Sequence, residues 1–322
     1  MTAPQNPKAN GAGAKRPPQI KKALPTVVLV AILFVLGSLP GWMGRSGWMD
    51  ILRPAEAAAA SAEGSLRIHV IDVGQGDSIL IDAQGEFMLI DGGERGQEDT
   101  VVQYLRDQGV EELRYVVATH PHTDHIGGLA YGVLAAFPVG EVIAPRLQKE
   151  HVPGSRTYEA FLAAVTELAR TQGTKASYAR PGLRYPLGEA AFTILAPLGE
   201  SVKEQNNNSV VLRLDYGKTS ALFTGDAEKT VESALVEEYG DGLRADLLKA
   251  GHHGSNTSSN ALFLYRVQPK LVAVSAGAMN DYGHPKPEML ARCLDAGAAV
   301  YRTDLDGTIV FAGDGTAFWV VT

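Results

Sequence analysis

Cysteine is almost absent from this sequence. Only Cys293 occurs among the 322 residues, within a helix-like stretch at 288–295. A lone cysteine cannot form an internal disulfide, and a metal site built from thiolates is nearly excluded. Any metal bound by this chain must therefore depend on histidine and carboxylate ligands.

Positive charge is scarce beyond the first sixty residues. The formal net charge is −7, but residues 1–60 hold seven of the 29 Lys and Arg residues and only two of the 36 Asp and Glu residues. The remainder therefore has 22 basic and 34 acidic residues, a net charge of −12. An acidic body does not attract polyanions at long range, so a nucleic-acid substrate would need a local basic patch or bound cations. This balance disfavours a high-affinity DNA-binding protein.

Only one long hydrophobic run occurs, and it lies near the amino terminus. Residues 1–22, rich in Pro, Gly, Asn and Lys, predict a disordered basic tail. Residues 23–44 carry no charge, and their length is sufficient for a transmembrane helix. The basic residues before this segment predict that the amino terminus stays in the cytoplasm and that the rest is exported. We expect a single-pass protein of the cell membrane whose catalytic domain lies outside the cytoplasm.

Two other interpretations of this segment stay open. The alanines at 57–60 are similar to a signal-peptidase cleavage region, and in that case the protein is secreted. Alternatively, residues 23–44 form a buried core helix. With an anchor or a signal, residues 45–64 are a linker.

Residues 65–322 are expected to form one domain, since no linker interrupts them. Runs of strands mixed with helices in both halves predict an α/β sandwich with two sheets inside and helices on both outer faces. Strands are expected at 66–73, 78–82, 87–90, 115–119, 141–144, 191–196, 209–216, 220–224, 246–249, 271–275, 299–302, 308–312 and 317–321. Helices are expected at 100–108, near 128–136, and at 157–171, 228–239, 261–267 and 287–296.

Six of the eight histidines fall in three short clusters: 120, 122 and 125; 252 and 253; and 284. The first cluster directly follows a predicted strand and is expected in a loop. There His120 and His122 can hold one cation, while Asp124 and His125 can reach a second. Imidazole and carboxylate ligands suit zinc, manganese or iron.

The first cluster has the form His120-x-His-x-Asp-His125, and on this motif the chain resembles the metallo-β-lactamase superfamily. Further motifs are similar to the hydrolase-like domain of ComEC-type competence proteins, and they extend over nearly all of residues 65–322. These motifs are Val73-Gly-Gln-Gly-Asp-Ser78, Leu89-Ile-Asp-Gly-Gly93, Asn207-Asn-Ser209, Thr224-Gly-Asp226, Lys249-Ala-Gly-His-His-Gly-Ser255 and Tyr282-Gly-His-Pro285. The resemblance implies an αββα sandwich and a metal-dependent hydrolase.

The resemblance also implies roles for single residues. Asp226 would bridge two metal ions, and Asp91 would lie beneath the metal loop and orient it. One residue of the pair His252 and His253 would complete a metal shell. We favour His253 as this ligand, and His252 would then contact the substrate or transfer a proton. His284 would ligate a metal or bind a leaving group, and Asp124 is expected to take part in catalysis as well.

One departure from the superfamily concerns the stretch before Asp226. Most members carry another histidine ligand there, whereas this chain has Asn207, Asn208 and Ser209. We expect Asn208 to lie just outside the metal shell, and one metal to be held loosely by fewer protein groups. After the histidine pair, Ser255 and Asn256 could donate hydrogen bonds to a phosphate, or could belong to an ordinary helix-capping loop.

The predicted cofactor is a pair of divalent ions, zinc or manganese, that makes a bound water nucleophilic. We expect a phosphodiesterase or nuclease that acts on DNA or another phosphodiester outside the cytoplasmic membrane, in DNA uptake or degradation. Two alternatives remain: a hydrolase of small exported esters such as choline phosphate esters, and a non-catalytic competence or envelope binding module. No protein partner can be inferred.

Overall fold

The structure, a computed structural model, describes residues 66–321 and contains two β-sheets. The larger sheet has, in spatial order, β15 (Phe318–Val320), β14 (Ile309–Gly313), β1 (Leu66–Val70), β2 (Ile79–Ala83), β3 (Glu86–Ile90), β4 (Leu113–Val117), β5 (Val139–Ala144) and β6 (Lys175–Tyr178). The smaller sheet has, in spatial order, β13 (Ala299–Arg302), β12 (Leu271–Val274), β11 (Leu247–Lys249), β10 (Thr219–Phe223), β9 (Val211–Tyr216), β8 (Ala190–Ala196) and β7 (Arg184–Leu187).

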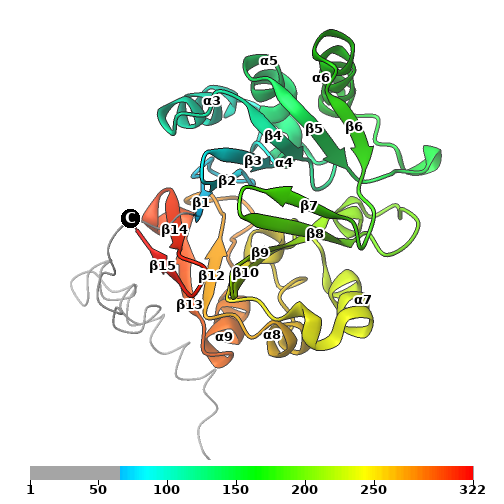
Figure 1. The fold of residues 1–322 in the computed structure, drawn as a ribbon. Coiled ribbons are helices and arrows are strands. Elements are labelled where there is room, and N and C mark those ends of the chain that lie inside the picture. Colours follow the sequence, from blue (N-terminus) through cyan, green and yellow to red (C-terminus); the bar gives the residue numbers. More distant parts are fainter. Residues whose placement is uncertain (1–65, 322) are drawn as a thin grey trace, which may run out of the picture. The chain divides into compact units, whose positions relative to one another are not determined.

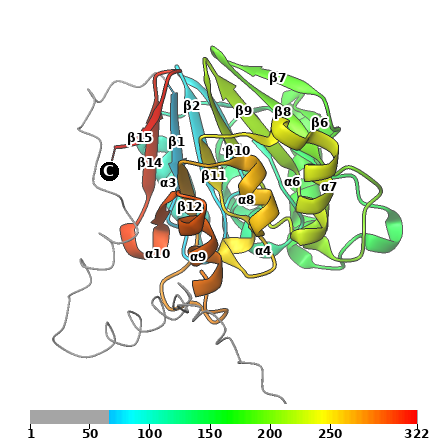
Figure 2. The same ribbon diagram turned by 90° about the horizontal axis from the view of Figure 1, so that it is seen from below.

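Helices cover the outer faces of both sheets (Figures 1 and 2). The helices over the larger sheet are α3 (Glu98–Asp107), α4 (Thr123–Gly128), α5 (Leu134–Ala136) and α6 (Arg156–Gln172), with a π-helical turn at Leu129–Val133. The helices over the smaller sheet are α7 (Lys229–Tyr239), α8 (Ala261–Val267) and α9 (Pro287–Asp295). A short helix, α10 (Thr303–Asp306), follows β13, and 3₁₀ turns occur at Lys149–His151, Gln205–Asn208, Gly240–Leu243 and Gly251–Gly254.

The main apolar core lies between the two sheets. Ile68 and Phe311 of the larger sheet and Phe192 and Leu212 of the smaller sheet belong to one buried cluster. Central strands are covered on both faces, and all five residues of β10 are buried. Strands of this kind have nearly continuous apolar runs rather than an alternation. The predicted sandwich of two inner sheets and two outer helical layers is thus confirmed.

Parallel pairing decides where the functional loops meet. Strands β3, β4, β5 and β6 pair in parallel, and so do β10, β11, β12 and β13. In the smaller sheet, Phe223 pairs with Lys249, which pairs with Ala273. Within each parallel set the strands therefore end at the same edge of the sheet, and the loops that follow them lie next to one another.

Strands β6 and β7 and the short helix α10 were not predicted, and one predicted helix begins earlier than expected. Strands β6 and β7 are short and largely exposed, so they lack the apolar pattern by which the other strands were found. The helix expected near 128–136 begins five residues earlier, at Thr123. Gly127 and Gly128 look like helix breakers, but they allow α4 to pack closely: a Cβ on Gly128 would lie 1.9 Å from the carbonyl oxygen of Gly92.

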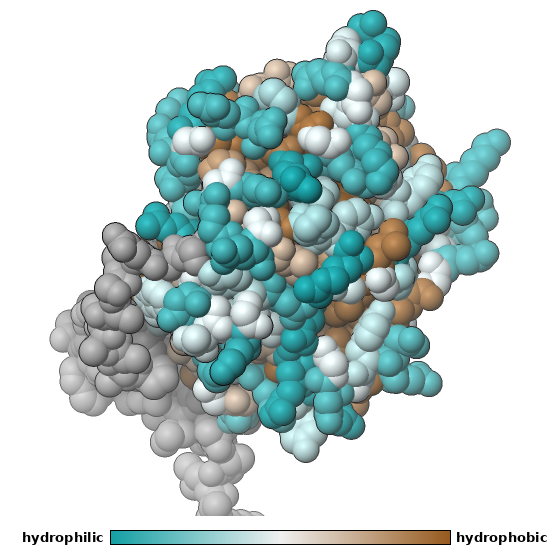
Figure 3. All heavy atoms as spheres, in the orientation of Figure 1, coloured by the Kyte–Doolittle hydropathy of each residue, from teal (hydrophilic) through white to brown (hydrophobic). Residues whose placement is uncertain are grey.

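The predicted tail, membrane segment and linker (1–22, 23–44 and 45–64) lie outside the described residues. Within residues 66–321, each helix is too short or too polar to cross a bilayer. Figure 3 shows that hydrophilic side chains cover most of one face of this region, with apolar patches between them.

Candidate metal centre

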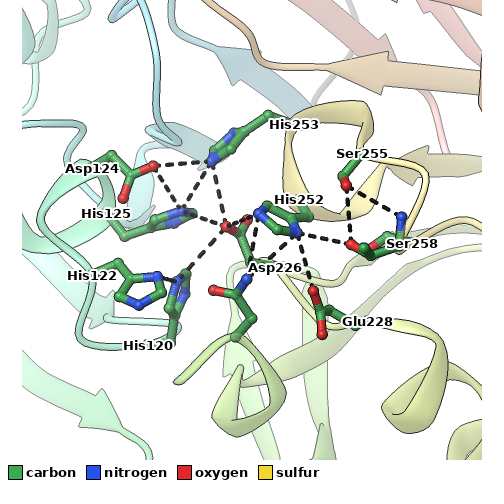
Figure 4. A network of polar contacts seen from close by, with 12 residues as sticks. His120, His122, Asp124, His125, Asp226, Glu228, His252, His253, Ser255 and Ser258 are labelled. Carbon is green, nitrogen blue, oxygen red and sulfur yellow. Dashed lines mark hydrogen bonds and ion pairs between the residues drawn. The ribbon is translucent and has the colours of Figure 1, made fainter. Parts of the chain in front are cut away.

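Segments that follow parallel strands supply the histidines and carboxylates of the site (Figure 4). His120 and His122 follow β4 of the larger sheet. Asp226 follows β10 and His253 follows β11, both in the smaller sheet. The site therefore lies where the two sheets bring the carboxyl ends of their parallel strands together.

Asp124 and His125 lie in the first turn of α4, so the prediction that they belong to the loop was wrong. The helix begins after His122, whose carbonyl accepts bonds from the backbone N–H groups of His125 and Ile126. Helical backbone fixes the direction of both side chains more firmly than a loop would.

One carboxylate oxygen, Oδ2 of Asp226, lies at the centre of the cluster. Its distances to histidine Nε2 atoms are 3.3 Å for His125, 3.5 Å for His253 and 3.8 Å for His120. All four side chains are at most 2% exposed. The predicted convergence of three distant loops is thus present in the structure.

The other predicted ligands lie around this centre. Asp124 Oδ2 is 3.2 Å from Nε2 of His253 and 3.9 Å from Nε2 of His125. His122 Nδ1 is 3.0 Å from Nε2 of His120. Four overlapping groups of described residues have ligand atoms close enough to share a cation. Two of them contain only predicted ligands: His120, His125 and Asp226; and Asp124, His125 and His253.

The hydrogen bonds behind the rings show that cations fit here. Nδ1 of His125 contacts Asp91, and Nδ1 of His253 contacts the carbonyl of Ser275, so both Nδ1 atoms carry the proton. In the neutral rings, Nε2 then has no proton and presents a lone pair. The Nε2 atoms of His125 and His253 lie 3.3 Å apart. Asp226 Oδ1 is buried without a hydrogen-bond donor among the described residues. Converging lone pairs need protons or metal ions between them.

The pKa values of the four rings shift in two directions. Burial lowers the pKa of His125 and of His253, but nearby carboxylates, Asp226 foremost, outweigh burial and hold both pKa values well above the usual range. For His120, burial prevails and the pKa lies well below its usual value. Burial likewise lowers the pKa of His122.

Asp91 lies beneath the metal loop, as predicted. Its carboxylate accepts hydrogen bonds from the N–H of Thr119 at 2.7 Å and from the Thr119 hydroxyl at 2.6 Å, and it lies 2.8 Å from Nδ1 of His125. The side chain is fully buried, and burial raises its pKa. Asp91 thus holds the loop and orients one ring.

A buried ion pair behind His253 was missed by the sequence interpretation. Lys249 Nζ lies 2.8 Å from Asp77 Oδ2, and both side chains are at most 2% exposed. Asp77 Oδ1 is 3.3 Å from Nδ1 of His253. The sequence signal for this pair was a lysine at the end of the otherwise apolar strand β11. A lysine that is buried in this way requires a partner of opposite charge.

The two adjacent histidines point to different places. Both have left-handed backbone, with φ of 50° for His252 and 52° for His253, between Gly251 and Gly254. His253 is buried and faces the centre, in agreement with its expected role as the ligand. His252 is partly exposed: its Nε2 is 3.9 Å from Asp226 Oδ2, while its Nδ1 is 3.0 Å from the Thr257 hydroxyl and 3.5 Å from Glu228.

An open pocket of about 630 Å³ leads to the centre. One wall is the loop that follows β12, where His284 packs edge-on against His252 with ring centroids 5.6 Å apart and stacks on Tyr282 at 5.7 Å. Burial, together with His252, lowers the pKa of His284 to about 4. The pocket is lined by Gln75, Glu94, His122, Thr123, Asp124, Asn206, Asp226, His252, His253, Met279, Asn280, Asp281, Tyr282 and His284.

Three predicted residues lie elsewhere. Asn208 makes its hydrogen bonds to Val202 and Gln205, whereas Asn206, which the sequence interpretation passed over, lines the pocket 3.4 Å from His252. The hydroxyl of Ser255 accepts bonds from Thr257, and Asn256 bonds to Glu288 on α9. Neither Ser255 nor Asn256 lines the pocket, since their loop turns away behind His252.

Comparison with known proteins identifies the family. The protein-family model for the metallo-beta-lactamase superfamily matches residues 71–277, more than half of the chain. The chain belongs to the metallo-β-lactamase superfamily. As a member, it has the expected His120-x-His-x-Asp-His125 motif, which spans the loop after β4 and the first turn of α4.

Relatives of this metallo-β-lactamase-fold chain include competence proteins, which confirms the predicted resemblance. Competence protein ComA of Neisseria gonorrhoeae is 30% identical over 292 residues, 89% of this chain and 38% of that protein. ComE operon protein 3 of Bacillus subtilis is 29% identical over 269 residues, 78% of this chain and 33% of that protein. The chain thus spans about a third of the length of these curated relatives.

Solved structures also share the fold. CmlA, a diiron β-hydroxylase from Streptomyces venezuelae, superposes with a TM-score of 0.51 at 15% identity, over 78% of this chain and 55% of that chain. At this identity the likeness shows the metallo-β-lactamase fold alone.

Proposed function

We propose that this protein is a hydrolase that binds two divalent metal ions, zinc or manganese, and cleaves phosphodiesters, with DNA as the leading substrate. The proposal places the domain outside the cytoplasmic membrane and assigns residues 23–44 as its anchor. The distant relatives named as competence proteins support a role in DNA uptake or degradation.

One observation carries the proposal. Asp226 Oδ2 lies within 3.8 Å of the Nε2 atoms of three buried histidines: His120 and His125 from the segment that follows β4, and His253 from the turn that follows β11. Asp124 extends this cluster, with Oδ2 at 3.2 Å from His253. A structural metal site is closed by its protein ligands, whereas this cluster opens into a pocket, as a catalytic site does.

The chain's own residues suit hydrolysis. Two bound cations would supply an activated water and positive charge beside the developing oxyanion. His120, His122, Asp124, His125 and His253 would hold them, and Asp226 would be shared. His252, at the mouth of the centre, would pass a proton to the leaving oxygen, because Thr257 and Glu228 orient its ring from behind.

A metal-supplemented activity screen tests the proposal. The full-length chain, purified in detergent, would be given zinc or manganese with single-stranded DNA or bis-p-nitrophenyl phosphate. We expect cleavage that a chelator abolishes and that the double variant Asp124→Ala/His125→Ala lacks. Hydrolysis restricted to lactones or thioesters would refute the phosphodiester assignment, and failure to bind either metal would refute the hydrolase.

The charge of the pocket favours a second candidate, a hydrolase of small choline phosphate esters. None of the described residues that line the pocket is Lys or Arg, whereas Glu94 and Asp281 add negative charge. Tyr282 is 63% exposed at the rim, and an aromatic face beside carboxylates attracts a quaternary ammonium group. Faster cleavage of p-nitrophenyl phosphorylcholine than of bis-p-nitrophenyl phosphate, lost on Tyr282→Ala, would favour this candidate over the nuclease.

A further inference from the structure

The buried pair of Lys249 and Asp77 lies directly behind the candidate metal centre. Lys249 Nζ also donates to the carbonyl of Ala250 at 3.0 Å, so two oxygen atoms hold the ammonium group in place. Asp77 in turn follows the loop at 72–76, and its backbone N–H donates to the carbonyl of Asp124 at 3.2 Å. The pair therefore connects β11, the loop before β2, and the metal-binding turn of α4.

A pair of charges in this position has a high desolvation penalty. Apolar residues of similar volume often stabilise a fold as well as a buried ion pair or better. Stability alone thus gives no reason for a lysine at the end of β11. The neighbouring ring gives one: the Nδ1–H of His253 already donates to the Ser275 carbonyl, and the Asp77 carboxylate adds a negative charge 3.3 Å from the same nitrogen.

We propose that Lys249 and Asp77 are positioning residues that act through His253: Lys249 fixes the Asp77 carboxylate, and this carboxylate orients the ring and strengthens its Nε2 as a metal ligand. Mutation of a residue that contacts the far nitrogen of a metal-bound histidine commonly weakens metal affinity 10- to 100-fold. The inference rests on the metal centre of the proposed function. It concerns the ligand group formed by Asp124, His125 and His253.

Zinc affinity in charge-altered variants tests the inference. Lys249→Met keeps the side-chain volume but removes the positive charge. Lys249→Met/Asp77→Asn removes both charges and leaves no unpaired ion in the core, so it serves as the test if the single variant does not fold. In full-length protein, competition with a chromophoric chelator should show that one of two zinc equivalents binds about 10- to 100-fold more weakly in either variant. Lys270→Met, which breaks the outlying 2.8 Å pair with Asp246, is the matched control and should leave zinc affinity unchanged.

Two further readouts separate positioning from a purely structural role. A structural pair would change the melting temperature of the metal-free protein, whereas a positioning pair changes the increase in melting temperature caused by zinc. With Co²⁺ as the probe, the visible absorption bands should shift in the double variant, because the ligand field of His253 changes. Zinc affinity within twofold of the unaltered protein together with unchanged cobalt bands would overturn the inference. Absence of metal binding by the unaltered protein would instead overturn the proposed function, and the inference with it.

Discussion

The two halves of the candidate centre differ in what lies behind their ligands. In the supported half, formed by Asp124, His125 and His253, Asp91 lies 2.8 Å from the far nitrogen of His125, and the Ser275 carbonyl and the Lys249–Asp77 pair lie behind His253. In the open half, formed by His120 and His122, a single threonine hydroxyl lies 3.1 Å from Nδ1 of His120. The ring of His122 faces the pocket.

Metal affinity should therefore differ between the two halves. Ligands that are oriented before the metal arrives lose less freedom on binding, so the supported half should bind more tightly. The stretch before Asp226, which has asparagines where most superfamily members have a histidine, adds no imidazole to the open half. The sequence-based expectation of one loosely held metal thus stays a prediction, now assigned to His120 and His122.

The largest effect is expected from the ligand that both halves share. Asp226→Asn keeps the shape but removes the central negative charge, so we expect the loss of both zinc equivalents and a fall in phosphodiester cleavage of roughly a thousandfold. Metal analysis and rate measurements would be made beside Asp241→Asn, the same charge change at an exposed residue outside the site. Full metal content in Asp226→Asn would contradict the shared role.

Removal of one ligand from each half compares them directly. We expect His253→Ala to weaken the tighter zinc equivalent about 100-fold and His122→Ala to weaken the looser one about 10-fold, as measured by chelator competition. A larger loss of zinc affinity in His122→Ala than in His253→Ala would contradict this assignment, because the open half would then dominate binding.

The pH dependence of zinc binding should also differ between the halves. Without metal, the raised pKa values of His125 and His253 mean that these rings carry protons at neutral pH, and zinc must displace them. Affinity of the supported half should therefore rise with pH, by about one log unit per pH unit for each displaced proton. The lowered pKa values of His120 and His122 predict a nearly flat profile for the open half. Zinc titrations at roughly pH 6, 7 and 8 would detect two slopes, and two equal slopes would contradict the assignment.

The smallest effect is expected at Ser255, whose side chain reaches His252 only through Thr257. Ser255→Ala should lower the free energy of unfolding by about 1 kcal/mol, because Thr257 loses its acceptor. Chemical denaturation and steady-state rates would measure this, with cleavage expected within about threefold of the unaltered protein. A loss of hundredfold or more would restore the sequence-based hypothesis that Ser255 binds a substrate phosphate.

The sequence predicted the parts of this molecule that repeat a local pattern. Apolar strands such as β12 and the helix α8 could be found from their residues alone, and the ligand motif contains His120 and Asp124. Lys249 and Asp77 could not be paired, because they are 172 positions apart and their contact depends on how the two sheets pack. Asn206 and Asn208 belong to a run of three asparagines, and only the geometry of the 3₁₀ turn decides which of them faces the pocket.

Left-handed backbone recurs at the centre of the site, at Asp91, His252 and His253. Each such residue with a side chain destabilises the native state by roughly 1–2 kcal/mol relative to glycine. Glycine would relieve this backbone strain at each position, but it would also remove side chains that form the site, such as the Asp91 carboxylate that holds Thr119 and His125. This strained backbone lies in the candidate metal centre, so thermostabilising substitutions are better sought in the outer helices.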